Sequence, residues 1–371
     1  MDKYEIAVIG GGLVGAAIAF GLRDLGPRIA LFDEGDVAHR AARGNFGLIW
    51  VQGKGLGMPS YGAWTQRSAR EWPRLASQLL RATGIDVALR QGGGLHVCLS
   101  QDELDVRERR MNTLASQAGF PECAVDVLDR AGVAAKLGAV GPQVAGGTFC
   151  ELDGECNPLR LLRALHAGFA EAGGIARFDR AVTHVEPAGQ GFVVHTAGGP
   201  LACERVVLAA GLANARLAPT LGLHAPVVPN KGQVIALERV RPFLSMPLGT
   251  LRQTDEGTVL IGDAQQDLGL DETLDTGVLA AMAQRAAHVF PFLRAARVMR
   301  AWAALRVMSP DGFPIYAQSR AHPGAWVATC HSGVTLAAVH AAALAQAIRE
   351  GALPAECSAF GAERFDVRAA A

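Results

Sequence analysis

The sequence has no excess charge of either sign. Its 371 residues carry 35 Lys and Arg against 35 Asp and Glu, so the formal net charge at pH 7 is zero. A broad basic surface is needed to bind nucleic acid, and an acidic tail is typical of a protein with a basic partner. Neither is present, so we expect chemistry on a small molecule and no nucleic-acid partner.

Cysteines at the spacing of a metal site are also missing. The seven cysteines are scattered, no C-x-x-C pair occurs, and Cys150 and Cys156 are too far apart for a common zinc knuckle. We therefore expect no metal site. Scattered thiols of this kind are typical of proteins from a reducing cytoplasm.

No stretch of the chain has the composition of a membrane span. Residues 6–22 lack charge but contain a run of glycines, and residues 321–348 are interrupted by Pro323, Gly324 and Gln346. We expect a soluble protein without a transmembrane segment, located in the cytoplasm.

What the chain does contain is a phosphate-binding turn within its first fifteen residues. The apolar run 6–9 is followed by Gly10-Gly-Gly12-Leu-Val-Gly15 and by the helix-like stretch 16–22. In a strand–turn–helix unit, Gly10 permits the tight turn, Gly12 admits a pyrophosphate, and Gly15 allows the helix to pack close to the strand. The helix N-terminus then offers free N–H groups to the phosphate charge.

Asp33 completes the dinucleotide motif. It follows a second apolar run, residues 29–32, and lies 23 positions after Gly10, where a carboxylate accepts hydrogen bonds from the adenosine ribose. An acid there suits the bare ribose of FAD or NAD and would repel the 2′-phosphate of NADP. A glycine-rich turn with an incidental acid is the alternative interpretation, and the strand–turn–helix context argues against it.

The rest of the pattern interleaves two kinds of sheet. Ser100 to Glu103 has the form of a capping box, and Asn157-Pro158 is typical of a helix start. The apolar run 206–210 indicates a return to a central parallel sheet, whereas strands around the turn 255–257 indicate an antiparallel platform. Helices are expected over 60–82, 101–117, 157–173 and 335–349, and strands over 95–99, 175–178, 181–186, 191–196, 206–210, 232–238, 248–254, 257–262 and 325–329.

Several segments, taken in order, resemble the D-amino-acid oxidase-like family of FAD enzymes, which includes glycine oxidase and sarcosine oxidase. Residues 45–55 and 305–316 are also similar to the catalytic β subunits of opine oxidases, hydroxyproline dehydrogenases and hydrogen cyanide synthase. The matching segments are the N-terminal motif with Asp33 and residues 43–47, 206–211, 302–314 and 330–336.

The resemblance implies an α/β fold in which a Rossmann-like FAD-binding domain is interleaved with an antiparallel-sheet substrate domain, with the isoalloxazine ring between them. The expected bounds are 1–88, 145–223 and 303–371 for the FAD-binding domain, and 89–144 and 224–302 for the substrate-binding domain. His39 lies where some relatives attach the flavin, but its surroundings match poorly. Residues 302–314 also lack the cysteine of sarcosine oxidases, so we expect non-covalent FAD.

Glycine-rich loops would surround this cofactor. Residues 43–55 contain four glycines, whose N–H groups can line a flavin without interference from side chains, although an ordinary surface loop has the same composition. Residues 330–335 enter a helix, so their N–H groups would face the ribityl chain or the flavin carbonyls. The residues expected to contact FAD are Gly10, Gly12, Leu13, Val14, Gly15, Asp33, Glu34, Arg43, Gly44, Asn45, Phe46, Gly47, Val182, Ala210, Gly211, Arg306, Ser332, Gly333, Val334 and Thr335.

Arg306 is the expected anchor for the substrate. It lies in an apolar setting, where an unpaired guanidinium is costly, and a bidentate substrate carboxylate would satisfy it. The carboxylate-binding arginine of the family occurs in a matching Leu-Arg context. An internal ion pair is the alternative interpretation.

Two further residues are candidates for the catalytic site. Arg252 shares a strand face with Thr250 and Thr254, and we consider it a second carboxylate contact because the tyrosine that the family has near Thr250 is absent. His331 lies beside the expected flavin, where it would orient the substrate or tune its proton balance. A histidine bonded to backbone is the alternative interpretation.

The resemblance implies oxidation of the C–N bond of an amino acid to the imine, by hydride transfer to flavin N5. A secondary or D-amino acid is expected, such as D-hydroxyproline, an opine or a glycine-like substrate. Such a reaction depends on positioning and electrostatics, which fits a chain without a catalytic triad or paired catalytic carboxylates. The electron acceptor would be oxygen, a quinone or a partner subunit. The alternatives are a flavin-bearing β subunit of a heteromeric dehydrogenase and an NAD-linked dehydrogenase, and we also consider an oligomer.

Overall fold

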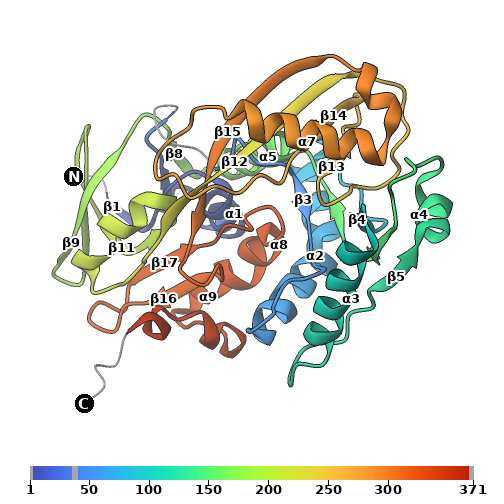
Figure 1. Cartoon of the computed structure of the whole chain (residues 1–371). Helices are drawn as coiled ribbons and strands as arrows, with labels where there is room; N and C mark the ends of the chain where they lie inside the picture. Colours follow the sequence, from blue (N-terminus) through green and yellow to red (C-terminus); the bar gives the residue numbers. More distant parts are fainter. Residues whose placement is uncertain (1–2, 36–40, 367–371) are drawn as a thin grey trace.

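The largest layer of the structure is a mainly parallel sheet (Figure 1). The structure is a computed structural model that describes residues 3–35 and 41–366. The sheet order is β16 (Ile315–Gln318), β17 (Ala325–Thr329), β11 (Gly199–Leu208), β1 (Lys3–Ile9), β2 (Ile29–Phe32) and β8 (Ile175–Arg177), and the hairpin of β9 (Val182–Ala188) and β10 (Gly191–Thr196) pairs with β11. Each pair of neighbouring strands from β17 to β8 in this order is parallel. This confirms the predicted α/β class and the return of residues 206–210 to the central sheet.

Helices bury one face of this sheet, and the hairpin of β9 and β10 together with residues 217–227 buries the other. Every residue of β2 and of β17 is buried, as expected for central parallel strands. Close contacts between helices depend on glycine: a Cβ at Gly21 would lie 2.2 Å from the carbonyl oxygen of Ala341, and one at Gly168 would lie 2.6 Å from the Phe20 ring. The helices involved are α1 (Leu13–Gly21), α2 (Pro59–Thr83), α5 (Pro158–Glu171), α8 (Ala337–Val339) and α9 (Ala345–Glu350), with a helical segment η5 (His340–Leu344) between the last two.

The C-terminal helix differs from the continuous helix expected over 335–349. It is divided by η5, which is a π-helical turn. The His340 side chain in this turn is fully buried, and its Nε2 lies 2.7 Å from the hydroxyl of Tyr316, which is also fully buried. A π turn inserts one extra residue per turn, and no local sequence pattern marks it.

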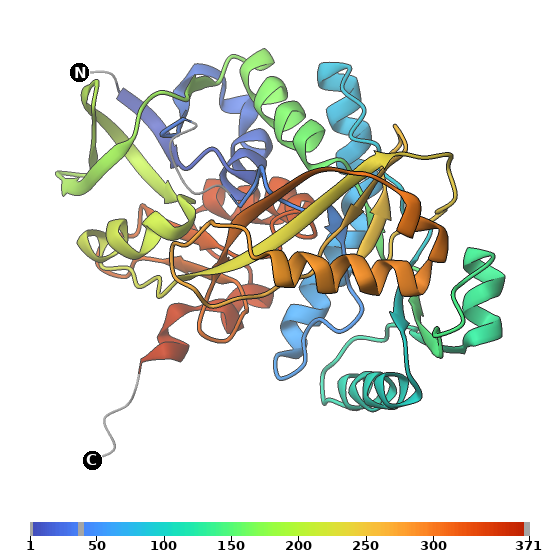
Figure 2. The same cartoon turned by 45° about the horizontal axis from the view of Figure 1, so that its top comes forward.

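A second sheet is antiparallel, with the order β13 (Leu251–Gln253), β14 (Thr258–Ile261), β12 (Val228–Arg239) and β15 (Val298–Met308). The antiparallel pairing of β12, β13 and β14 confirms the prediction for this part of the chain. Figure 2 shows α7 (Thr276–Val289) lying across this sheet. Neither α7 nor the strand β15 was among the expected elements.

A third sheet, in the order β4 (Gly94–Cys98), β6 (Gly146–Cys150) and β5 (Asp126–Asp129), carries α3 (Gln101–Ala115) and α4 (Arg130–Leu137). Its side chains Leu95 and Phe149 share one apolar core with Ile235 and Leu251 of the second sheet. The predicted cap of α3 is present, because the Ser100 hydroxyl accepts a hydrogen bond from the Glu103 N–H at 3.2 Å.

Short elements complete the described chain. They are β3 (Leu48–Ile49), β7 (Gly154–Glu155), α6 (Asn214–Leu217), η1 (Arg23–Arg28), η2 (Gly211–Ala213), η3 (Pro219–Leu221), η4 (Pro291–Ala295), η6 (Ala355–Phe360) and η7 (Ala362–Phe365). Within residues 3–35 and 41–366, no helix combines the length and the apolar character that crossing a membrane requires.

The division into two interleaved domains stays a prediction, and two strands lie differently from it. β6 falls inside the predicted FAD-binding segment 145–223, yet it pairs with β4 and β5. β15 runs through the predicted boundary between residues 302 and 303, since its pairing with β12 extends as far as Met308.

Candidate active site

A cavity of about 300 Å³ opens at the carboxyl edge of the parallel sheet. Its walls include the segments that directly follow β1, β2, β11 and β17, namely residues 9–14, 32–35, 209–213 and 328–331. This edge is where open α/β sheets bind their ligands, because the strand ends and the helix N-termini converge there.

The first glycine turn has the close approaches that the motif predicts. Gly10 has a φ of 104°, and a Cβ there would lie 2.3 Å from the carbonyl oxygen of Ala209. A Cβ at Gly15 would lie 1.9 Å from the carbonyl oxygen of Gly10, so helix α1 packs directly on the turn. A Cβ at Gly12 would instead meet nothing nearer than Ala42 at 3.8 Å, so this residue borders open space where a diphosphate fits.

Asp33 is held in a fixed orientation at the wall of the cavity. Its Oδ2 accepts a hydrogen bond from the Gly11 N–H at 2.7 Å, and its Oδ1 accepts one from the Gly35 N–H at 3.1 Å. A carboxylate oxygen has a second lone pair, so both oxygens can also accept ribose hydroxyls. The turn and this acid together fit the adenosine diphosphate part of FAD.

The cavity brings together most, but not all, of the residues expected to contact FAD. Those that line it are Gly10, Gly12, Leu13, Val14, Asp33, Glu34, Arg43, Asn45, Val182, Ala210, Gly211 and Gly333, together with His331. Those that do not are Gly15, Gly44, Phe46, Gly47, Arg306, Ser332, Val334 and Thr335. His39, considered above as a covalent attachment point, lies outside the described residues.

Residues 43–47 connect the cavity with the antiparallel sheet. A Cβ at Gly44 would lie 2.2 Å from that of Ala304 on β15, and the Gly44 carbonyl accepts a hydrogen bond from the Trp302 indole N–H at 3.2 Å. The Phe46 ring lies so close to Gly262 that a Cβ there would be 2.9 Å from it. This loop therefore packs directly against the sheet that carries Arg306.

The loop 330–335 is held in place by hydrogen bonds with Trp50 and with Trp72 of α2. Thr335 Oγ1 accepts a hydrogen bond from the Trp50 N–H at 3.1 Å, and the Trp72 indole N–H donates to the Val334 carbonyl at 3.1 Å. Val334 and Thr335 thus hold the loop in place, while Gly333 and His331 face the cavity.

Arg306 extends from β15 across the backbone of β12. A Cβ at Gly232 would lie 2.6 Å from its Nη1, so this glycine makes room for the guanidinium. Nη1 donates to the Ala264 carbonyl at 2.7 Å and to Asn230 Oδ1 at 3.2 Å. Burial lowers the pKa of Arg306, and nearby Asp263 raises it in opposition. No carboxylate of the described residues forms an ion pair with Arg306, and its role as the carboxylate anchor stays a prediction.

Lys54 is a functional candidate that the sequence pattern did not reveal. Its Nζ lies 3.1 Å from His331 Nε2 and 3.0 Å from Ser332 Oγ, and the Tyr61 hydroxyl lies 2.8 Å from Ser332 Oγ. Desolvation lowers the pKa of Lys54 to about 8, and the charge of Arg306 adds to this shift. Burial, followed by the charges of Lys54 and Arg306, lowers the pKa of His331 well below its usual value. The only signal in the sequence is a lysine between two glycines, Gly53 and Gly55.

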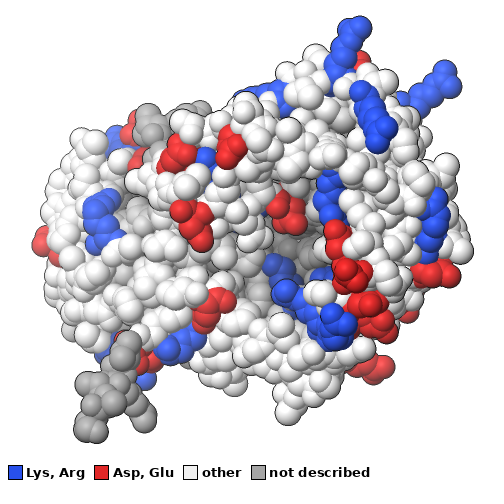
Figure 3. Space-filling view, viewed as in Figure 1, with Lys and Arg blue, Asp and Glu red and all other residues white. Residues whose placement is uncertain are grey.

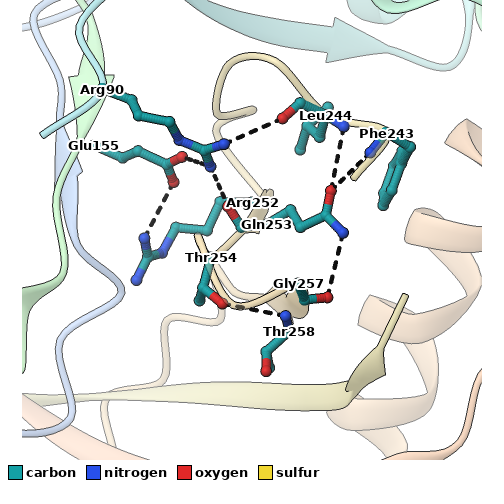
Figure 4. Close-up of polar contacts among 9 residues, drawn as sticks. All are labelled: Arg90, Glu155, Phe243, Leu244, Arg252, Gln253, Thr254, Gly257 and Thr258. Atoms are coloured by element: carbon teal, nitrogen blue, oxygen red, sulfur yellow. Dashed lines mark hydrogen bonds and ion pairs between the residues drawn. The ribbon is translucent and has the colours of Figure 1, made fainter. Parts of the chain in front are cut away.

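Arg252 lies elsewhere than expected. Its side chain is buried, and Nη1 donates to Glu155 Oε2 at 3.1 Å, while Arg90 bonds the other oxygen of Glu155 (Figure 4). A Cβ at Gly47 would lie 3.0 Å from Arg252 Nη2, so the arginine also packs against the loop 43–47. The charge of Arg252 is paired with Glu155 in this structure, and its role as a second substrate anchor stays a prediction.

The described residues also contain no group of three His, Cys, Asp or Glu side chains arranged to hold a metal ion. Charged side chains that line the cavity include Asp33, Glu34, Arg43, Arg180 and Arg216, and His331 connects the cavity with Lys54. Such a lining suits a dinucleotide cofactor.

Comparison with known proteins agrees with this geometry. The family model described as DAO: FAD dependent oxidoreductase matches residues 5–347. The chain is 40% identical over 370 residues to a subunit of opine oxidase from Rhizobium meliloti, covering 100% of each chain. It is 26% identical over 411 residues to the HcnC subunit of hydrogen cyanide synthase from Pseudomonas protegens, covering 98% of this chain and 97% of that one. The crystal structure of glycine oxidase from Geobacillus kaustophilus is similar with a TM-score of 0.87 at 25% identity, covering 97% of this chain and 98% of that one.

Replacing Asp33 tests the cofactor site. Asp33→Ala should weaken FAD binding roughly 10- to 150-fold, since hydrogen bonds to a charged acceptor contribute about 1.5–3 kcal/mol. The dissociation constant is measured from the fluorescence of FAD added to the apoprotein. Asp24→Ala, which removes a surface ion pair with Arg349, is the control and should leave FAD binding unchanged. Equal affinity of the Asp33 variant and the wild type would mean that another residue holds the ribose.

Replacing Glu155 tests the buried charge cluster of Figure 4. Glu155→Gln leaves the Arg252 guanidinium buried without a counter-charge, so the free energy of unfolding should fall by about 3–5 kcal/mol. Urea unfolding measures the change. The matched control is Glu204→Gln, which breaks the solvent-exposed pair with Lys3 and should cost less than about 1 kcal/mol. A loss as small as that of the control would show that the cluster does not stabilise the fold.

Proposed function

The chain belongs to the DAO family of FAD dependent oxidoreductases, and we propose that it oxidises the C–N bond of a secondary or D-configured amino acid to the imine. D-hydroxyproline, an opine or a glycine-like compound fits this class. FAD is the cofactor, which replaces the NAD-linked alternative, and we propose that it binds non-covalently in the cavity at the sheet edge.

The observation that carries the proposal is the state of Arg306. It is a half-buried guanidinium with two neutral acceptors and, in the described parts of the chain, no acid partner. Removing such a charge from water is costly unless an anion compensates it. A substrate carboxylate supplies that anion in a planar geometry that matches the guanidinium.

The residues of the site act mainly by positioning. Arg306 would bind the carboxylate and thereby present the α-carbon and the amine in one orientation. When bound, FAD accepts the α-hydrogen with its electron pair. His331 stays neutral, so it would orient its neighbours and would not donate a proton to the amine, which must arrive uncharged. Water then adds to the imine carbon and releases an amine and an oxo acid.

A dependence on a partner subunit is the second candidate arrangement. Two of the similar proteins are described as subunits, of opine oxidase and of hydrogen cyanide synthase. The flavin would then pass electrons to a partner and not directly to oxygen or a quinone. Steady oxygen consumption by the isolated chain with an amino-acid substrate would argue against this arrangement. We further propose a cytoplasmic enzyme, because all seven cysteines are free.

Arg306→Ala provides the test of the proposed function. We expect FAD to remain bound while kcat/KM for the amino-acid substrate falls by two to four powers of ten, since losing a desolvated bidentate contact costs about 3–5 kcal/mol. Arg306→Lys retains the charge without the planar fork and should recover part of the activity. Stopped-flow reduction of the flavin measures the effect.

Two controls separate an anchor from a structural arginine. Arg297→Ala, at the exposed position directly before the same strand, should leave kcat/KM unchanged. Amines without a carboxylate should respond little to Arg306→Ala. If the variant instead loses its flavin or unfolds, Arg306 has a structural role and the proposal fails.

A further inference from the structure

We propose that Lys54 is a second anion anchor of the substrate site, which binds the second carboxylate of an amine that carries one on each side of its nitrogen. The proposal rests on the function proposed above, in which Arg306 binds the first carboxylate. It assigns to Lys54 the second.

Lys54 differs from the other lysines in what it contacts. The chain has only four lysines, and two of them have acid partners: Lys3 pairs with Glu204, and the fully buried Lys231 pairs with Asp271 at 2.7 Å. Lys136 lies over the ring of Phe149 at 3.5 Å. Lys54 has the neutral acceptors His331 Nε2 and Ser332 Oγ and lies over the Tyr61 ring at 5.7 Å, and no acid of residues 3–35 and 41–366 forms an ion pair with it.

The position of Lys54 is set by a buried network. The segment that carries it is held by Asp153, whose carboxylate accepts hydrogen bonds from the N–H groups of Val51 and Gln52 at 2.5 and 3.2 Å and from the Gln52 side chain at 2.7 Å. On its other side, Lys54 contacts His331, which lines the cavity. A cation fixed in this way is preorganised for a ligand, because little side-chain freedom remains to be lost on binding.

The charged groups around Lys54 leave an excess of positive charge, which a dianion would balance. Arg306 is close enough for its charge to lower the pKa of Lys54, and Asp263 is near both cations. The Cys330 thiol is protonated, since burial raises its pKa to about 12, and burial likewise raises the pKa of Asp153 to about 7. The carboxylate of Asp153 is also near Lys54, but it already accepts hydrogen bonds from Val51 and Gln52, so the two cations and Asp263 complement a molecule with two carboxylates and one amine.

The surface of the molecule is hollowed and carries charges of both signs around the hollow. In Figure 3 the face of the molecule is hollowed near its centre, with Lys and Arg side chains gathered below the hollow and an acidic side chain above it. Asp263 itself is exposed and has a φ of 83°, a left-handed conformation that is costly for a residue with a side chain. This places a carboxylate near Arg306 and Lys54 without an ion pair to either, where it can accept a hydrogen bond from the neutral substrate amine.

Binding of unreactive ligands tests the proposal without turnover. Thiodiacetate and methylthioacetate differ only in the second carboxylate, and neither has a C–N bond. In the FAD-loaded wild type, thiodiacetate should bind more tightly by roughly 10- to 150-fold, the range for hydrogen bonds to charged groups. Lys54→Met should abolish this preference by weakening the binding of thiodiacetate far more than that of methylthioacetate. The shift of the visible flavin absorbance reports both dissociation constants, and Lys3→Met is the control.

Turnover gives an independent readout. Iminodiacetate and sarcosine form a matched pair of substrates, again differing in one carboxylate. Lys54→Met should reduce the ratio of their kcat/KM values towards one by lowering the value for iminodiacetate. An equal loss for both substrates would overturn the proposal, because Lys54 would then act on the flavin or on electron transfer. Lys54→Gln serves as a second variant if the methionine variant does not retain FAD.

The pH dependence separates a charge from a packing effect. Without a bound ligand, desolvation lowers the pKa of Lys54 to about 8. The preference for thiodiacetate should therefore decline as the pH rises above 8, because the Lys54 ammonium loses its proton. Lys54→Arg should retain the preference to higher pH, since a guanidinium stays charged. A preference that is independent of pH in the wild type contradicts the assignment.

The outcomes also distinguish this proposal from the function on which it rests. If thiodiacetate is preferred and Lys54→Met abolishes the preference, yet neither amine reduces the flavin, the anion anchor stands and the proposed oxidation fails. If Arg306→Ala abolishes the oxidation of both amines while Lys54→Met changes neither, the oxidation stands and the second anchor fails.

Discussion

The close approach of the first glycine turn to the end of β11 is the constraint on which the site depends. Gly10 lies against the carbonyl of Ala209 at a distance that admits no Cβ, and Gly15 lies equally close to Gly10. Segments far apart in the sequence are thereby held in one parallel register, from Lys3 beside Ala202 to Ile9 beside Leu208. Because four strand ends meet at this edge, their loops line one cavity.

Buried charges away from the site are paired with opposite charges of the protein, whereas the two cations at the site have no such partner in the described part of the chain. Glu155 bonds both Arg90 and Arg252, and Lys231 bonds Asp271, so these charges are neutralised within the fold. Arg306 and Lys54 have only neutral acceptors among the described residues, although they lie near enough to repel each other. Uncompensated cations destabilise a folded protein, and a ligand that removes this cost binds where they lie.

Local signals in the sequence located most elements that surround the cofactor. The caps at Ser100 and Asn157 begin α3 and α5 as predicted, since each side chain bonds N–H groups within a few residues. The helix α7 was missed although Asp275 caps it in the same way, because its alanine-rich sequence has no clear apolar face. β15 was missed as well: only its long pairing with β12 makes it a strand.

The sequence by itself determined that the cofactor is a dinucleotide and that residues 206–210 return to the central parallel sheet. The reason is that Gly10, Gly15 and Asp33 act through local backbone geometry and fixed spacing along the chain. Only the tertiary structure decided which cations are neutralised. Arg252 and Arg306 look alike as arginines on strands, but Glu155 meets the first and no described acid pairs with the second. Charge pairing depends on contacts between distant segments, and these are decided only when the chain has folded.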